Sequence, residues 1–120
     1  MRHFVRISLI AVCALASPGA GAHAFLDHAV PAVGSTLRNA PAEVSIWFTQ
    51  ELELSFSGAE VMNANGNRVD RNDPHVDRSD ATLLHLSLLP LAPGTYRVHW
   101  HVLSVDTHRT EGNFTFTIAP

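Results

Sequence analysis

Apolar and polar residues alternate with a period of two along several segments of the chain, and no helical apolar period runs through residues 23–120. The clearest alternation lies in residues 95–103, where one strand face is apolar and the other carries arginine and histidine. The apolar residues, which we expect to face a core, are Tyr96, Val98, Trp100 and Val102. The pattern predicts a strand covered by protein on one side.

Further alternating segments are separated by clusters of Gly, Pro, Asn and Asp, which favour turns. Strands are expected at residues 44–48, 59–64, 82–88 and 112–119. Asn65-Gly66 predicts a tight hairpin turn, after which the chain should return through residues 67–70. Residues 71–80 are polar and rich in turn formers, which indicates an exposed loop and the most mobile segment.

With a first strand at residues 23–29, the pattern gives about seven strands. It predicts an all-β fold, an immunoglobulin-like Greek-key β-sandwich, with a small closed barrel as the alternative. Either fold gathers loops from distant parts of the sequence at one end, where a site can form. The length allows one such domain, residues 23–120.

Residues 1–22 have the composition of a secretory signal peptide. Arg2 and Arg6 precede an apolar run at residues 7–16, and Ala20-Gly21-Ala22 is the small-x-small pattern that signal peptidase accepts. The apolar run is shorter than the roughly 20 residues that span a bilayer, which argues against a retained anchor. We expect export, cleavage after Ala22 and a mature chain that begins at His23.

Lipoprotein processing at Cys13 is disfavoured, because the branched Val12 stands where a small residue is expected. Cleavage after Ala22 removes this single cysteine, so the mature chain has neither a disulfide nor a thiolate metal ligand.

The charge of the mature chain limits its partners. Six arginines against eleven acidic residues give a formal charge of −5, which argues against nucleic acid and anionic lipid. We expect a monomer that does not insert into a membrane.

A histidine at a free N-terminus can bind a metal through its backbone amine and its imidazole Nδ1 together. These nitrogen donors suit copper(II). In an extended chain Asp106 and His108 would point to one side while Thr107 faces away, so the two could supply the remaining donors. A surface ion pair, or a buried histidine held by a carboxylate, is the alternative reading of this Asp-x-His pair.

These segments resemble the CopC family of periplasmic copper-binding proteins over essentially all of residues 23–119. The matching residues are His23-Ala24-x-Leu26, Pro31, Pro41-Ala42-x-Val44-x-Ile46-x-Phe48, Leu91-x-x-Gly94-x-Tyr96-x-Val98-x-Trp100, Ser104-Val105-Asp106-Thr107-His108 and Gly112-x-Phe114-x-Phe116.

The resemblance implies a periplasmic β-sandwich that binds one copper(II) ion through His23, Asp106 and His108. It further implies a protein that buffers, carries or delivers copper in copper homeostasis and resistance, with an inner-membrane copper transporter as a partner. No catalysis is required.

Two departures from the family pattern change this expectation. Some members hold copper(I) in a methionine-rich loop, but Met62 is the only methionine of the mature chain, so we expect a copper(II) site alone. Members often carry a glutamate near the N-terminal amine, where this chain has Thr49-Gln50-Glu51. Gln50 or Glu51 is therefore the candidate that supports the amine.

No ligand role is assigned to the other histidines of the mature chain, which are expected to face solvent. They are His28, His75, His85, His99 and His101. His99 and His101 share one strand face, which leaves room for a weak zinc or nickel site.

Two other functions are compatible with parts of this pattern. An N-terminal histidine with a second histidine resembles the copper brace of lytic polysaccharide monooxygenases, but Asp106 would fill a position that oxygen chemistry needs vacant. A structural sandwich without metal would also satisfy the strand pattern.

Overall fold

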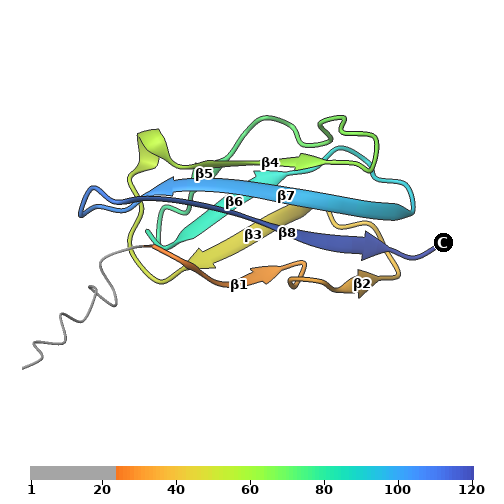
Figure 1. The fold of residues 1–120 in the computed structure, drawn as a ribbon, viewed down its shortest axis with the longest axis horizontal. Helices are drawn as coiled ribbons and strands as arrows, with labels where there is room; N and C mark the ends of the chain where they lie inside the picture. Colours follow the sequence, from red (N-terminus) through yellow and green to blue (C-terminus); the bar gives the residue numbers. More distant parts are fainter. Residues whose placement is uncertain (1–23) are drawn as a thin grey trace, which may run out of the picture.

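The computed structural model describes residues 24–120, which form two four-stranded sheets packed face to face (Figure 1). One sheet has the order β1 (Leu26–Val30), β3 (Glu43–Phe48), β6 (Leu83–Ser87) and β5 (His75–Val76). The other has the order β2 (Thr36–Leu37), β8 (Arg109–Ile118), β7 (Gly94–Leu103) and β4 (Gly58–Met62). A short 3-10 helix, η1 (Leu54–Phe56), precedes β4.

This architecture confirms the predicted all-β sandwich. All strand pairs are antiparallel except β2 with β8, which is parallel. The predicted signal peptide and His23 lie outside the described residues. Within residues 24–120, no helix has the length and apolar character needed to span a bilayer.

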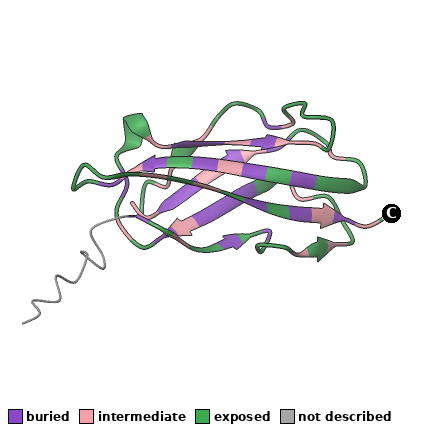
Figure 2. Ribbon diagram, in the orientation of Figure 1, coloured by how far each residue is buried: buried purple, intermediate pink, exposed green. Residues whose placement is uncertain are grey.

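The core lies between the sheets and is formed by the apolar faces that the sequence predicted. Buried and exposed residues alternate along β7 (Figure 2), with the four predicted apolar residues of that strand all buried. The same alternation buries Phe114, Phe116 and Ile118 of β8 and Val44, Ile46 and Phe48 of β3. The rings of Phe48 and Trp100 meet edge to face at 5.1 Å between centroids, joining the two sheets.

The turn at Asn65-Gly66 forms as predicted, with Gly66 at φ 80° and the Asn63 carbonyl accepting from its amide. The return through residues 67–70 differs from the prediction. It makes only isolated bridges, first Met62 with Arg68 and then Asp70 with Leu88. The chain therefore crosses from the β4 sheet to the β6 sheet here.

Asp70 fixes this crossing. Its buried carboxylate accepts hydrogen bonds from the backbone amides of Val61 and Asn72, at 2.9 and 2.8 Å, and from Arg68 Nε at 2.8 Å. Burial alone raises the pKa of Asp70, but the hydrogen bonds and the Arg68 charge outweigh it and lower this pKa below its ordinary value.

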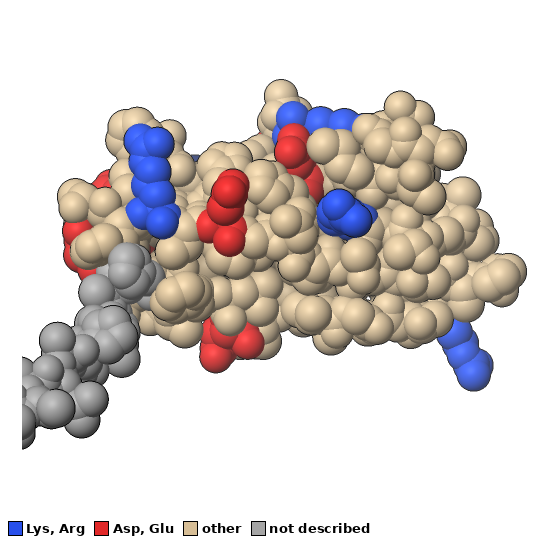
Figure 3. All heavy atoms as spheres, in the orientation of Figure 1, with Lys and Arg blue, Asp and Glu red and all other residues tan. Residues whose placement is uncertain are grey.

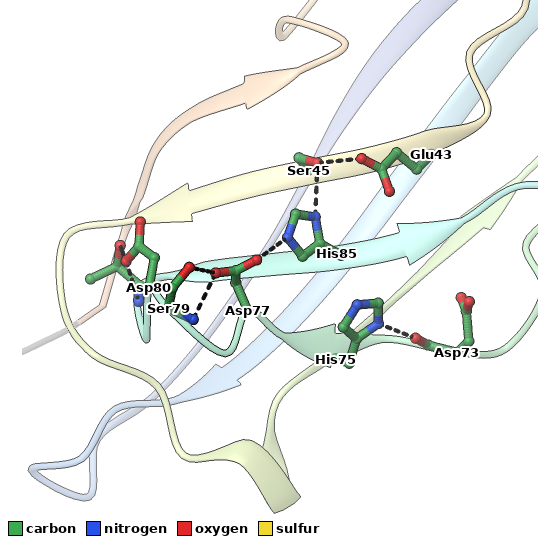
Figure 4. A network of polar contacts seen from close by, with 9 residues as sticks. Glu43, Ser45, Asp73, His75, Asp77, Ser79, Asp80 and His85 are labelled. Atoms are coloured by element: carbon green, nitrogen blue, oxygen red, sulfur yellow. Dashed lines mark hydrogen bonds and ion pairs between the residues drawn. The ribbon is translucent and has the colours of Figure 1, made fainter.

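Residues 71–80 are more ordered than the sequence predicted, since β5 pairs with β6 inside them. His85 of β6 contacts Asp77 Oδ1 through Nε2 at 2.9 Å and Ser45 Oγ through Nδ1 at 3.1 Å (Figure 4). Hydrogen bonds from His85 and Ser79 lower the pKa of Asp77 to about 2, so its carboxylate is ionised at neutral pH and can only accept. His85 Nε2 therefore carries the proton, and this network holds the segment against the sheet.

Candidate metal centre

The predicted Asp-x-His pair lies in the turn between β7 and β8, at the end of the sandwich where β1 begins (Figure 1). Fully buried Ser104 organises this turn. Its amide donates to the His108 carbonyl at 3.0 Å, and its carbonyl accepts from the Thr107 amide at 2.9 Å. Thr107 has a φ of 74°, in the left-handed region, and this conformation allows the chain to turn back toward β8.

The turn brings the side chains of Asp106 and His108 together, with 3.3 Å between Oδ1 and Nδ1. The expected extended geometry is wrong, because residues 105–107 form a turn and the left-handed Thr107 supplies the reversal. The side chains are 40% and 47% exposed respectively, so an ion from solvent can reach both.

Asp106 is held in its charged form by its neighbours. The Ser104 hydroxyl donates to Asp106 Oδ1. This bond, followed by contact with His108, lowers the pKa of Asp106 below its ordinary value. A carboxylate oxygen and an imidazole nitrogen at this separation can bind one metal ion, and together they suit copper(II) or zinc(II).

The start of the described chain lies beside this turn. The carbonyl of fully buried Ala24 accepts a hydrogen bond from the Thr110 hydroxyl, two residues beyond His108. Phe25 and Thr49 exchange hydrogen bonds of 3.0 and 2.9 Å, which tie the next residue to the end of β3. The path of the chain at Ala24 is therefore fixed against β8.

The segment that holds Gln50 and Glu51 runs along the same turn. The Val105 amide donates to the Glu51 carbonyl at 3.1 Å, and Leu52 forms a bridge with Ser104. Gln50 is half-buried and Glu51 is exposed. Both residues thus belong to this end of the sandwich, and a role for either in supporting the N-terminal amine stays a prediction.

The other histidines lie on the outer faces of the two sheets. His28 stacks on Trp47, with 4.4 Å between ring centroids. His75 and His85 face each other across β5 and β6, and His99 and His101 lie along β7. Among residues 24–120, no three His, Cys, Asp or Glu side chains are gathered closely enough to hold a metal. Within residues 24–120, Asp106 and His108 are thus a pair of candidate ligands without a third beside them.

Charged side chains do not gather into a patch of one sign on the face shown in Figure 3, where arginine and acidic residues are interspersed among uncharged ones.

Comparison with known proteins decides the family. Residues 26–119 match the CopC domain. The chain belongs to the CopC family. This membership assigns it a function connected with copper and makes copper its expected ligand.

Two solved CopC-family structures have the same fold. CopC from Methylosinus trichosporium OB3b is 30% identical and superposes with a TM-score of 0.77, covering 82% of this chain and 95% of that one. PcoC, a methionine-rich copper resistance protein from Escherichia coli, is 31% identical with a TM-score of 0.68, covering 80% of this chain and 98% of its own.

Among the sequence relatives, protein YobA of Escherichia coli K12 is 34% identical over 110 residues, which cover 91% of this chain and 89% of YobA. The copper transport protein CutJ of Bacillus subtilis is 33% identical over 98 residues, which are 81% of this chain but only 18% of CutJ. A CopC-like domain is thus part of a much longer chain in CutJ.

Proposed function

We propose that the processed chain binds one copper(II) ion through His23, Asp106 and His108 in the periplasm, and that it buffers this copper and delivers it to a membrane transporter. The observation that carries the proposal is the Asp106–His108 pair, exposed and 3.3 Å apart at the end of the fold where the chain enters. Cleavage after Ala22 completes the site by freeing the amine of His23.

Covalent geometry supports the participation of His23. Its Cα lies about 3.8 Å from that of Ala24, because consecutive Cα atoms are separated by that distance. The Ala24 carbonyl is hydrogen-bonded to Thr110. Thr110 lies two residues after His108, a distance of about 7 Å along an extended strand. Two imidazole side chains can bridge such spans, so His23 and His108 can share one ion.

The donor set supports copper(II) over copper(I). An amine, two imidazoles and a carboxylate are hard or borderline donors that suit the tetragonal geometry of copper(II). Copper(I) prefers thiolate and thioether sulfur, and the only thioether of the mature chain belongs to Met62, a residue of β4. We therefore propose a single copper(II) site.

A carrier fits this site better than an oxidative enzyme. Four donors from three residues would fill the tetragonal plane, which leaves no equatorial position for oxygen. The exposure of both side chains allows a partner to approach and take the ion. The CutJ relationship supports a transporter as this partner, because a CopC-like domain there is joined to a longer copper transport protein.

The test is equilibrium dialysis of the processed chain and its variants against copper(II) at neutral pH. The unaltered chain is expected to retain one equivalent, and His108→Gln is expected to weaken binding by at least about 100-fold, since even the loss of a group that only supports a ligand costs 10- to 100-fold. His28→Gln is the matched control, because His28 is also exposed and lies 2.7 Å from a carboxylate, that of Asp27. Equal retention by His108→Gln and His28→Gln would refute the assignment.

A further inference from the structure

Ser104 follows directly on β7 and is 0% exposed, although serine is mostly a surface residue. A hydroxyl buried in this way needs a hydrogen-bond partner. Two acceptors lie within its reach, Oδ1 of Asp106 and the backbone carbonyl of His108, the second at 3.2 Å. The buried hydroxyl thus contacts both residues of the candidate ligand pair.

The single proton of the Ser104 hydroxyl can be donated to only one of these acceptors. The carboxylate of Asp106 is charged, and hydrogen bonds to charged acceptors are the stronger ones. The His108 carbonyl already accepts from the Ser104 amide at 3.0 Å. The hydroxyl proton therefore belongs to Asp106.

We propose that Ser104 is a positioning residue of the copper(II) site, and that its hydroxyl holds the Asp106 carboxylate in the direction in which it meets the ion beside His108. This inference rests on the proposed function. Ser104 is not itself a ligand and acts through Asp106. A carboxylate has two oxygens and about four lone-pair positions, so it can accept from Ser104 and bind an ion at the same time.

The turn itself is held by backbone groups that do not involve this hydroxyl. The Ser104 amide donates to the His108 carbonyl, the Ser104 carbonyl accepts from the Thr107 amide at 2.9 Å, and the Val105 amide donates to the Glu51 carbonyl at 3.1 Å. All three bonds remain possible when Ser104 is replaced by alanine. The hydroxyl is thus needed for the direction of a side chain rather than for the path of the backbone.

Asp106 gains from such a bond because its side chain is 40% exposed. An exposed side chain moves between staggered rotamers, and apparent affinity falls with the fraction of the chain in the conformation that can bind. A bond from a hydroxyl fixed in the core favours the rotamer in which Asp106 Oδ1 lies 3.3 Å from His108 Nδ1. The carboxylate is then oriented before the ion arrives, which lowers the cost of binding.

Asp77 and Ser79 form a hydroxyl–carboxylate pair of a different kind in the same fold. The Asp77 carboxylate accepts from the amide of the exposed Ser79 at 3.0 Å as well as from its hydroxyl at 2.8 Å, so the aspartate closes its own turn. In the Ser104–Asp106 pair the order is reversed and the hydroxyl residue is the buried one. A residue of the core therefore fixes a carboxylate of the surface.

The first test needs no metal. We expect the NMR couplings between Hα and Hβ of Asp106 to show one dominant rotamer in the metal-free processed chain, and averaged values in Ser104→Ala. Ser57→Ala is the matched control, because the part-buried Ser57 hydroxyl contacts the amide and carbonyl of Leu103 at 3.1 and 3.4 Å, one residue before Ser104. Averaged couplings in the unaltered chain, or unchanged couplings in Ser104→Ala, would overturn the proposal.

The second test is a competition titration with copper(II) at pH 8. Ser104→Ala is expected to weaken binding by about 10- to 100-fold, the range for groups that support a ligand. In a chain that already carries Asp106→Ala, the same replacement should change affinity by no more than about twofold, because no carboxylate remains to be oriented. An equal loss in both backgrounds would mean that Ser104 acts on the whole turn, against the proposal.

The unaltered processed chain separates this inference from the proposed function. If it retains one equivalent of copper(II) and Ser104→Ala binds with the same affinity, the role of Ser104 is refuted and the proposed function stands. If the unaltered chain retains no copper(II), both fail. Thermal unfolding followed by circular dichroism establishes that each variant is folded, and the couplings of the unaltered chain test the proposal even where a variant is not.

Discussion

One alanine added before His23 is expected to weaken copper(II) binding by about 1,000-fold, because it replaces the chelating amine with an amide. The amine and imidazole of one residue act as linked donors, and such linkage contributes factors of 10² to 10⁴ that are lost when both cannot bind together. The measurement is a competition titration of processed and extended chains against a copper(II) chelator of known affinity.

The matched control is a chain with one alanine added after Pro120, which changes length and mass equally but leaves the amine of His23 free. The pH dependence gives a second readout. A free α-amine titrates near roughly 8 and an imidazole near about 6.5, so the affinity of the processed chain should fall between pH 8 and pH 5. Equal copper(II) affinities for the chain extended before His23 and the chain extended after Pro120 would show that His23 is not a ligand.

Asp70→Ala is expected to lower the free energy of unfolding by about 3 kcal/mol. The Asp70 side chain is 0% exposed, and its loss takes this acceptor from the buried amide of Val61, from the part-buried amide of Asn72 and from Arg68 Nε. Each buried polar group that loses its partner costs about 1–3 kcal/mol. Urea denaturation at pH 7 measures the change, and Asp27→Ala, which removes an exposed carboxylate, should alter stability by less than about 0.5 kcal/mol.

The pH dependence of this effect has a definite sign. The pKa of Asp70 is lowered in the folded chain, so its contribution is present above the ordinary carboxyl range near about 4 and is lost as pH falls through the lower, folded-state value. The stabilities of the two chains should therefore converge in acid. A constant difference from pH 7 to pH 2 would contradict the role given to the Asp70 carboxylate.

The strand pattern predicted the fold well because burial imposes a period of two on each strand that lines the core. The apolar face of β7 and the Asn65-Gly66 turn could both be read directly. The order of residues 71–80 could not be read, because it depends on β5 pairing with β6 and on the contact of Asp77 with His85. These contacts depend on which residues of β5 and β6 lie opposite each other, and that register is known only from the folded sheet.

The candidate site likewise has a part that the sequence predicted and a part that only the folded structure shows. Residue types and spacing indicated Asp106 and His108, but the reason for their approach was wrong. The buried Ser104 and the left-handed Thr107 form a turn that no period-two pattern describes.

The most direct test of the central claim is the electron paramagnetic resonance spectrum of the processed chain loaded with one equivalent of copper(II) at pH 8. The proposed site predicts a single tetragonal species whose superhyperfine splitting comes from three nitrogens, one amine and two imidazoles, with a carboxylate oxygen as the fourth donor. The spectrum should change when His108 is replaced by Gln and when the amine is blocked. A spectrum identical in all three chains would contradict a copper(II) site built on His23 and His108.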